Sequence, residues 1–291
     1  MGDSFLKYLQ FEKRYSPKTI AAYETDLRQF QEFLNKEFDN SSIQDANHAL
    51  VRSWVVNLVE GEMDSVSVNR KIACLRSYYK FLMRQEVINK DPMTKIKILK
   101  TKKKLPHFVH EADMTKALDH FEFEKNFQGL RDQLILELLY GTGMRLSELI
   151  GLKDLSINLR ERTLKVLGKR NKERVIPFTQ NLGVLIDNYR KIRNKEVERK
   201  SENLLVTENG LPLYPVMVNR IVKKYLKNSN VEKKSPHVLR HTYATHLLNK
   251  GAEINAVKDL LGHTSLAATQ VYTHNSMEKL KKVFDQAHPK A

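Results

Sequence analysis

The sequence predicts a mainly α-helical protein of two domains, with a small β-hairpin in the second domain. Its 291 residues are enough to bury two modest hydrophobic cores. Apolar residues recur at steps of three and four through most of the chain, which is the spacing of one helix face. A lysine-rich segment bracketed by prolines, residues 92–107, is the predicted linker between a first domain at residues 1–91 and a second at residues 108–291.

Four helices are predicted in the first domain. Ser16 can cap a helix that has Pro17 at its first position, and an apolar stripe follows. Residues 68–82 carry a second apolar stripe at helical spacing. Two further helices are expected at residues 5–15 and 50–59. Together they predict a small helical bundle.

The second domain is predicted to be mostly helical around one hairpin. Residues 130–140 form an apolar helix, and the sequence Gly-Thr-Gly ends it just before Arg145. Two short β-type runs, residues 163–167 and 174–178, flank a basic turn. This pattern is typical of a β-hairpin.

The charge of the chain points to a polyanionic partner. The formal net charge is +16, and residues 1–100 hold only 16 of the 50 basic side chains and 13 of the 34 acidic ones. The rest of the chain therefore carries +13. Nucleic acid or an anionic membrane surface would attract such a charge.

The membrane alternative has little support in the sequence. No apolar run approaches the ~18 residues of a spanning helix, and the N-terminus shows neither a lipidation nor a secretory signal. The single cysteine, Cys74, cannot form an internal disulfide and is expected to be a small core residue. We therefore expect a cytoplasmic protein with no membrane partner.

Two groups of polar side chains are candidates for contacts with nucleic acid. The first lies opposite the apolar stripe of residues 68–82, and either enters a major groove or is an ordinary solvated face. The second belongs to the linker, and either follows the phosphates or is a solvated connector. The first group is Asn69, Arg76, Lys80 and Arg84, and the second is Lys102, Lys103 and Lys104.

A set of cationic side chains and one tyrosine in the second domain suits phosphoryl transfer. A phenol has a pKa near 10, so a nucleophilic tyrosine needs fixed positive charge on the phosphate, a base for its proton and an acid for the leaving oxygen. Two arginines, two histidines, a lysine and a tyrosine can supply these roles without a metal or another cofactor. The residues are Arg145, Lys169, His237, Arg240, His263 and Tyr272.

A zinc site is the alternative explanation of two histidines in this set. His237 and His241 are four residues apart, a spacing that can bind zinc. No acidic residue lies between them to act as a base, and the adjacent Arg240 would repel a cation. We therefore predict no metal site.

The motifs that contain these residues resemble those of the tyrosine recombinases of the phage integrase family, and within it the Xer recombinases, the group of XerC and XerD. The resemblance covers nearly the whole chain. SPKTIAAYETDLRQF and VNRKIACLRSYYKFL resemble the N-terminal core-binding domain, a SAM-like helical bundle. GTGMRLSEL, GKRNKER, HVLRHTYATHLL, LGHTSLAATQVYTH and VFDQAHPKA resemble the α+β catalytic domain and its tail helix.

The resemblance implies a site-specific recombinase that cuts and rejoins double-stranded DNA. The implied role is the resolution of chromosome dimers at a dif-like site. Three alternatives stay open: an integrase or transposase of a mobile element, a DNA-relaxing enzyme of the type IB topoisomerase kind, and a DNA-binding module without catalysis.

Carried over position by position, the resemblance implies a role for each motif residue. Tyr272 would be the nucleophile that forms a 3′-phosphotyrosyl link and frees a 5′-hydroxyl. Arg145 and Arg240 would clamp the non-bridging oxygens, a task suited to planar, permanently charged groups. Glu148, three residues after Arg145, is expected to brace the first arginine.

The remaining roles concern proton transfer and hydrogen bonding. Lys169 would be the general acid that protonates the departing 5′ oxygen, His237 a general base or phosphate ligand, and His263 a further donor to the phosphate. In Xer recombinases the hairpin turn contains Gly-Lys-Gly, whereas here Arg170 replaces the second glycine. Because a non-glycine residue disfavours positive φ, Arg170 or Lys172 is an alternative acid, with Lys169 preferred.

The resemblance also implies an assembly on DNA. We expect a homo- or hetero-tetramer, formed alone or with a second recombinase, and a DNA translocase is a candidate activator. An apolar stripe near the C-terminus is expected to dock into a neighbouring protomer rather than onto its own domain. Its members are Met277, Leu280, Val283 and Phe284.

Overall fold

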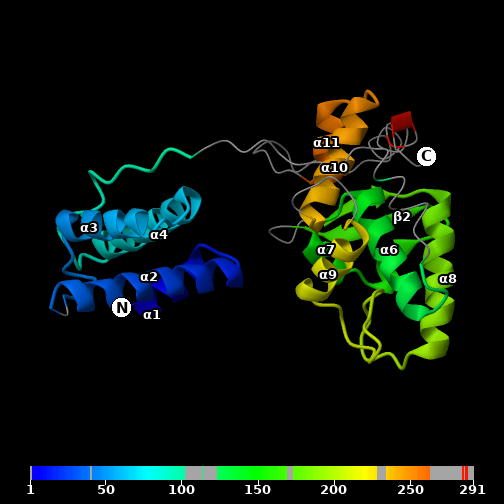
Figure 1. The fold of residues 1–291 in the computed structure, drawn as a ribbon, viewed down its shortest axis with the longest axis horizontal. Coiled ribbons are helices and arrows are strands. Elements are labelled where there is room, and N and C mark those ends of the chain that lie inside the picture. Colours follow the sequence, from blue (N-terminus) through cyan, green and yellow to red (C-terminus); the bar gives the residue numbers. More distant parts are fainter. Residues whose placement is uncertain are drawn as a thin grey trace. The chain divides into compact units, whose positions relative to one another are not determined.

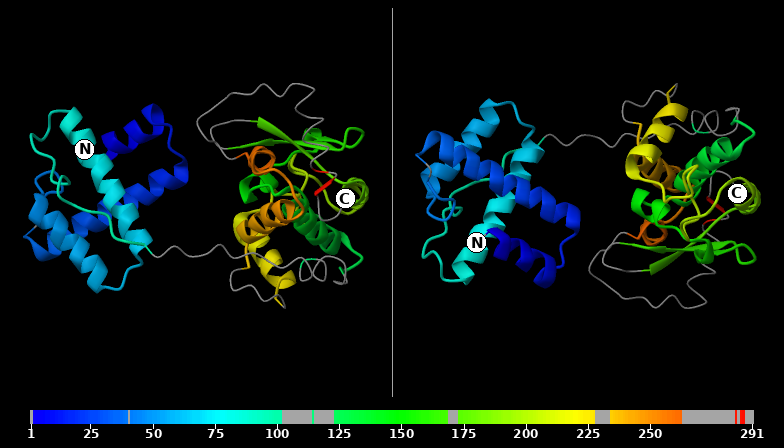
Figure 2. Two further views of the ribbon diagram at one scale, coloured as in Figure 1. Left: turned by 90° about the horizontal axis from the view of Figure 1, so that it is seen from above. Right: turned by 90° about the horizontal axis from the view of Figure 1, so that it is seen from below.

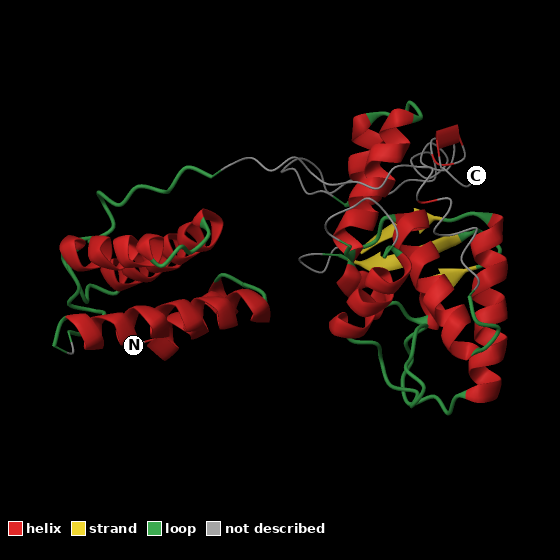
Figure 3. Ribbon diagram, in the orientation of Figure 1, coloured by secondary structure: helices red, strands yellow, loops and turns green. Residues whose placement is uncertain are grey.

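A computed structural model describes residues 2–39, 41–101, 114, 123–168, 173–227, 234–262, 284 and 286–287. The chain divides into two compact units, residues 1–104 and 105–291 (Figure 1). Among the described residues, strands occur only in the second unit (Figure 3).

Helices build the first unit around one hydrophobic core. They are α1 (Gly2–Lys7), the π-helical segment η1 (Tyr8–Glu12), α2 (Pro17–Glu37), α3 (His48–Glu60) and α4 (Ser65–Arg84). Helix α2 begins as predicted, because the Ser16 hydroxyl accepts the Thr19 N–H at 3.2 Å and Pro17 occupies the first turn. The apolar stripe of α4 is buried, as predicted. The helix expected at residues 5–15 instead changes to a π-helix at Tyr8 and ends at Glu12.

A buried ion cluster fixes α2 against α4. Asp26 on α2 is fully buried, and Lys71 on α4 donates to its Oδ1 at 2.8 Å, while Arg70 also binds this carboxylate. Because a charge is tolerated in a core only when it is paired, the cluster sets the relative position of the two helices. Cys74 is buried beside them, as predicted, and burial raises the pKa of its thiol.

Part of the predicted linker packs on the first unit. Ile96 is buried in the core of this unit. The Asn69 side chain exchanges two hydrogen bonds with the backbone of Leu99, and Arg76 donates to the Ile96 carbonyl at 2.9 Å. Residues 92–99 are therefore packed against the first unit and are not a free connector.

The second unit combines helices with a three-stranded antiparallel sheet of order β1-β2-β3. Helix α6 is largely buried and packs against α8 and α10, while α11 contacts β3 and α10. Figure 2 shows the sheet along one side of these helices. The elements are α6 (Phe127–Thr142), α7 (Leu146–Ile150), the 3-10 turn η2 (Asp154–Ser156), β1 (Ile157–Asn158), β2 (Thr163–Leu167), β3 (Glu173–Pro177), α8 (Gln180–Glu196), α9 (Pro215–Tyr225), α10 (Pro236–Asn249) and α11 (Ile254–Leu261). No helix among the described residues has the length and apolarity needed to cross a membrane.

The predicted hairpin is present, and its register decides which side chains face the core. Leu164 pairs with Ile176 and Val166 pairs with Arg174. The first three of these residues are buried apolar side chains, and Arg174 shares their inward face with only 5% of its surface exposed. The short strand β1, which the sequence did not predict, extends the hairpin to three strands.

One residue of the C-terminal apolar stripe, Phe284, belongs to the described part of the chain. Phe284 is 1% exposed and Ala287 is 2% exposed, so both are buried against their own chain. An apolar ring in water gains most from the nearest core it can reach. The docking of this stripe into a neighbouring protomer stays a prediction, and Met277, Leu280 and Val283 lie outside the described residues.

Candidate active site

A left-handed glycine ends α6 and turns the chain toward Arg145. Gly143 has φ of +60°, and a Cβ at this position would lie 2.4 Å from Cδ1 of Tyr243, so the turn requires glycine. Arg145 follows as the N-cap of α7, and its backbone N–H donates to Glu148 Oε2 at 2.7 Å. The backbone of Arg145 is thus fixed by α7 itself.

Glu148 is the buried acceptor between two arginines. Its Oε1 accepts from Arg145 Nη1 at 2.8 Å and from Arg174 Nη1 at 2.6 Å, and its Oε2 accepts from Arg174 Nη2 at 2.8 Å. Burial raises the pKa of the Glu148 carboxyl, but the hydrogen bonds and charge of Arg174, together with those of Arg145, outweigh burial and leave the pKa below its ordinary value. The prediction that Glu148 braces Arg145 is confirmed.

Three arginines also hold the C-terminal end of α11. Each donates to one of three successive backbone carbonyls, which carry the partial negative charge of a helix C-terminus. The pairs are Arg174 Nε with Leu260 O at 3.0 Å, Arg240 Nη2 with Leu261 O, and Arg145 Nη2 with Gly262 O at 2.9 Å. Arg145, Arg174 and Arg240, with Glu148 between the first two, are called the arginine cluster below.

Arg240 is the least solvated catalytic candidate among the described residues. It lies on α10, is 9% exposed, and donates through Nη1 to the carbonyl of Gly143. Burial lowers the pKa of Arg240 to about 10, and repulsion from Arg145 and Arg174 adds to this effect. The guanidinium is still charged at neutral pH, and it is held by backbone carbonyls rather than by a carboxylate.

The arginine cluster carries a net positive charge. It contains three guanidinium groups and one carboxylate, which leaves an excess of two positive charges. Arg145 has 28% of its side chain exposed, so this charge reaches the surface. A phosphodiester gains a second negative charge as a nucleophile adds to phosphorus, and a preorganised excess of positive charge stabilises that state. The cluster therefore suits phosphoryl transfer on a polyanion.

Comparison with known proteins agrees with this chemistry. Residues 107–279 match the phage integrase family, and residues 3–86 match the phage integrase N-terminal SAM-like domain. The tyrosine recombinase XerC of Staphylococcus carnosus is 38% identical over 290 residues, which cover 99% of this chain and 97% of that protein. XerC of Chlorobaculum parvum is 35% identical over 316 residues, covering 99% and 94%. The chain belongs to the phage integrase family. It is a site-specific tyrosine recombinase, an enzyme that breaks and rejoins DNA strands.

Solved structures share the fold of this recombinase. The Tn1549 transposon integrase in complex with transposon right-end DNA has a TM-score of 0.73 at 19% identity, and the match covers 97% of this chain and 98% of that one. The XerH recombinase bound to palindromic difH substrate also has a TM-score of 0.73, at 21% identity, covering 97% and 83%. At these identities the likeness concerns the fold alone.

The structure brings two of the six predicted catalytic residues of the recombinase together. Arg145 and Arg240 donate to the adjacent carbonyls of Gly262 and Leu261. His237 is exposed on the first turn of α10, one turn before Arg240. The other three, Lys169, His263 and Tyr272, lie outside the described residues. Within the described part of the chain, no three His, Cys, Asp or Glu side chains are grouped so that they could hold a metal ion.

The predicted DNA contacts of the first unit fall into two kinds. Asn69 and Arg76 are engaged with the backbone of residues 96–99. Lys80 and Arg84 are exposed, and Arg84 lies 3.7 Å from Glu12. Lys102, Lys103 and Lys104 lie outside the described residues. All seven stay predictions.

Arg174 is the site residue that the sequence analysis missed. It was treated only as the first residue of a strand, yet it contacts Glu148 with two nitrogens and the end of α11 with the third. One signal was available in the sequence. An arginine at the inward position of a strand that also places Val175 outward and Ile176 inward needs a buried acceptor.

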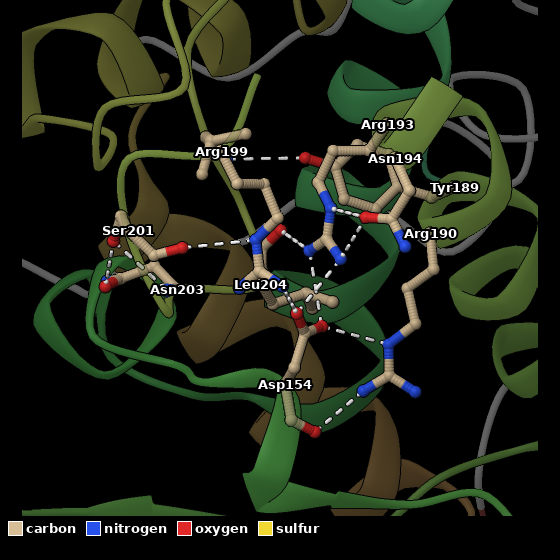
Figure 4. A network of polar contacts seen from close by, with 10 residues as sticks. Asp154, Tyr189, Arg190, Arg193, Asn194, Arg199, Ser201, Asn203 and Leu204 are labelled. Atoms are coloured by element: carbon tan, nitrogen blue, oxygen red, sulfur yellow. Dashed lines mark hydrogen bonds and ion pairs between the residues drawn. The ribbon is translucent and has the colours of Figure 1, made fainter. Parts of the chain in front are cut away.

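A second set of arginines, which shares no residue with the arginine cluster, surrounds Asp154 (Figure 4). The carboxylate accepts from Arg190 Nε at 3.0 Å and from Arg193 Nη2 at 2.9 Å, and it forms an ion pair with Arg199 Nη1 at 2.9 Å. Arg193 is 1% exposed and also donates to the Leu204 carbonyl at 2.7 Å. This set ties the end of α8 to η2 and to the chain after α8.

The low pKa of Glu148 makes a prediction about acid stability. A carboxyl whose pKa is depressed by folding stabilises the protein above its ordinary pKa of 4.5, and this contribution is lost as the pH falls through the lower folded value. Glu148→Gln should therefore lower the free energy of unfolding at pH 7 by about 3 kcal/mol, the scale of breaking a buried ion pair. The gap between the two proteins should shrink below pH 4.5 in urea unfolding followed by circular dichroism.

Glu202→Gln is the control for this measurement. Its carboxylate is exposed and pairs with Lys153 at 2.9 Å, so its replacement should change stability little at any pH. A Glu148→Gln gap that stays constant or widens on acidification would contradict the assignment.

Proposed function

We propose that Arg145 and Arg240 hold the scissile phosphate while Tyr272 attacks it. The observation that carries this proposal is the convergence of the two arginines on one helix end, with the net positive charge of the arginine cluster around them. The family supplies the reaction, since tyrosine recombinases cut DNA by transesterification. No hydrolysis is involved, so the bond energy is kept for rejoining.

The bond changes balance without an added reactant. The Tyr272 oxygen forms a bond to phosphorus, and the bond from phosphorus to the 5′ oxygen breaks. The phenolic proton passes to a base, for which His237 is the candidate, and Lys169 gives a proton to the departing oxygen, which leaves as a 5′-hydroxyl. His263 donates a hydrogen bond to the phosphate. Rejoining is the same sequence reversed, with a 5′-hydroxyl as nucleophile.

The proposed biological role is the resolution of chromosome dimers at a dif-like site. Its support is the near full-length similarity to XerC proteins from several bacteria. An integrase or transposase of a mobile element is the second candidate, because the Tn1549 integrase shares the fold. A DNA-binding module without catalysis is the third, and the presence of every catalytic residue type argues against it.

The proposed assembly is a tetramer on double-stranded DNA in the cytoplasm, homomeric or formed with a second recombinase, with a DNA translocase as a candidate activator. The bundle of residues 1–91 would grip one side of the duplex through Lys80 and Arg84, aided by the linker of residues 92–107. Residues 108–291 would carry out catalysis. The excess of basic residues in the chain favours a DNA partner of this kind.

Tyr272→Phe should abolish the covalent adduct and spare DNA binding. Phenylalanine lacks the attacking oxygen but keeps the ring and leaves the charge of the site unchanged. The measurement is denaturing electrophoresis of the protein after incubation with a nicked suicide duplex, beside a binding titration on the intact duplex. An adduct that persists with phenylalanine, or one that forms only with magnesium, would defeat the mechanism.

A sulfur-substituted substrate identifies the general acid. Lys169→Ala should slow cleavage of the normal duplex by about 10² to 10⁴, the usual contribution of general acid catalysis. It should cleave a 5′-bridging phosphorothiolate at nearly the wild-type rate, because a thiolate leaves without protonation. Lys172→Ala is the matched control and should be slow on neither substrate. If Lys172→Ala is instead slow on the normal duplex and fast on the phosphorothiolate, Lys172 is the general acid.

Cell division separates the chromosomal role from a mobile-element role. Deleting the gene should give filamentous cells with unseparated chromosomes, and expression of wild-type protein but not of Tyr272→Phe should restore division. A host unable to carry out homologous recombination forms no chromosome dimers, so there the deletion should have no effect. Normal division in the deletion strain, with excision of a mobile element lost, would favour the second candidate.

A further inference from the structure

Arg174 joins Glu148 on α7 to the end of α11, and it does so from the strand β3. Its two terminal nitrogens donate to the two oxygens of Glu148, which in turn holds Arg145. Its Nε donates to the Leu260 carbonyl, one residue before the carbonyl that holds Arg240. Arg145 makes a parallel connection from Glu148 to Gly262, so Arg174 is the member that ties both α7 and the end of α11 to the sheet.

The packing around Arg174 leaves little freedom for this bridge. The side chain is 5% exposed and points inward from β3. Gly262 has φ of +62°, and a Cβ there would lie 3.0 Å from Cδ of Arg174, so the left-handed end of α11 rests on the arginine stem. Gly262 is also the acceptor of Arg145.

The sequence position of Arg174 adds a third connection. Arg174 is the second residue of β3 and follows Lys169 by five positions in the sequence. Gly262 immediately precedes His263. The bridge is thus anchored next to the chain segments that carry two further catalytic candidates.

We propose that Arg174 is a positioning residue for strand cleavage, which sets Arg145 and Arg240 at the spacing that a phosphate requires. The proposal rests on the proposed function of the site. Arg174 itself is too buried to bind DNA, so it acts through Glu148 and through the carbonyls at the end of α11. Its charge also contributes to the positive excess that faces the phosphate.

Lysine cannot replace arginine in this role. The guanidinium presents three nitrogens in one plane, and here all three are used at once on two oxygens of one residue and the carbonyl of another. An ammonium group keeps the charge but is a single point donor, so it cannot span Glu148 and Leu260 with the same geometry. Arg174→Lys therefore tests position while the formal charge stays constant.

Arg193→Lys is the matched control in the same unit. Arg193 is 1% exposed, and it too donates to both oxygens of a carboxylate, Asp154, and to a backbone carbonyl, that of Leu204. None of these partners belongs to the arginine cluster. The control thus measures what the loss of an equivalent buried arginine does to the fold alone.

The experiment measures single-turnover cleavage of a suicide duplex at saturating protein, with DNA affinity and melting temperature measured in parallel. Arg174→Lys should cleave about a hundredfold more slowly, the scale expected when reacting groups shift by about 1 Å. Its DNA affinity should stay within about threefold of wild type, and Arg193→Lys should cleave within about threefold of wild type. Cleavage by Arg174→Lys within threefold of wild type, or no slower than by Arg193→Lys, would overturn the proposal.

A neutral substrate separates positioning of the arginines from a general loss of structure. A methylphosphonate at the scissile position has one anionic oxygen fewer, so its cleavage depends less on how well Arg145 and Arg240 are placed. The deficit of Arg174→Lys should be at least tenfold smaller on this substrate than on the phosphate. Equal deficits on the two substrates would count against the proposal.

Two further comparisons cover an Arg174→Lys variant that does not fold and a failure of the proposed function itself. If Arg174→Lys does not fold, the double variant Glu148→Gln with Arg174→Gln is compared with Glu148→Gln alone. It should cleave at least tenfold more slowly than that single variant, and equal rates would overturn the proposal. If wild-type protein forms no adduct, the proposed function fails. If wild-type protein forms one that Tyr272→Phe loses, but Arg174→Lys forms it within threefold of the wild-type rate, only the positioning role fails.

Discussion

The carboxylate of Glu148, shared by Arg145 and Arg174, is the contact on which the geometry of the catalytic unit depends. A buried carboxylate without partners would be strongly destabilising, and three buried or half-buried arginines without acceptors would be equally so. The carboxylate and the arginines satisfy these needs together. Glu148 accepts four hydrogen bonds, and the carbonyls at the end of α11 accept three. Removing Glu148 deprives two arginines of their shared acceptor, and removing Arg174 deprives the carboxylate of two donors. With Arg240 on the carbonyls of Gly143 and Leu261, the cluster links α7, β3, α10 and α11.

The number of arginines around a carboxylate does not by itself make a site. Asp154 also has three arginines, and two of them, Arg190 and Arg193, have side chains no more than 21% exposed. The charge count there is the same, three guanidinium groups to one carboxylate, but all three arginines bind the carboxylate directly. In the arginine cluster, Arg240 does not touch Glu148 and is satisfied by dipoles alone. Dipoles stabilise a cation without neutralising it, so its charge remains available to a phosphate.

The sequence predicted the elements whose signals are local. Ser16 and Pro17 mark the start of α2, and the glycines before Arg145 mark the end of α6, because caps and left-handed turns depend on a few adjacent residues. Motif resemblance located the catalytic candidates. The carbonyls that hold Arg145 and Arg240 had no such signal, since backbone acceptors look alike in every sequence and only the tertiary fold selects them. The packing of Ile96 on the first unit was missed for the same reason, as a lysine-rich segment gives no indication of its long-range partners.

The carbonyl contacts also explain how the site can exist before DNA arrives. Among the described residues, Arg145 donates one hydrogen bond from each terminal nitrogen, and so does Arg240. A guanidinium has five N–H groups, so each arginine keeps donors for a phosphate without releasing the protein. A ligand that adds to these contacts does not have to break them, and the arginines need little reorganisation when charge develops on the phosphate. Dipoles that are already oriented stabilise the transition state better than water does, because water must reorganise around the new charge. Because DNA joins a framework already held by Glu148 and α11, the rate of cleavage should depend on that framework more than the affinity for DNA does.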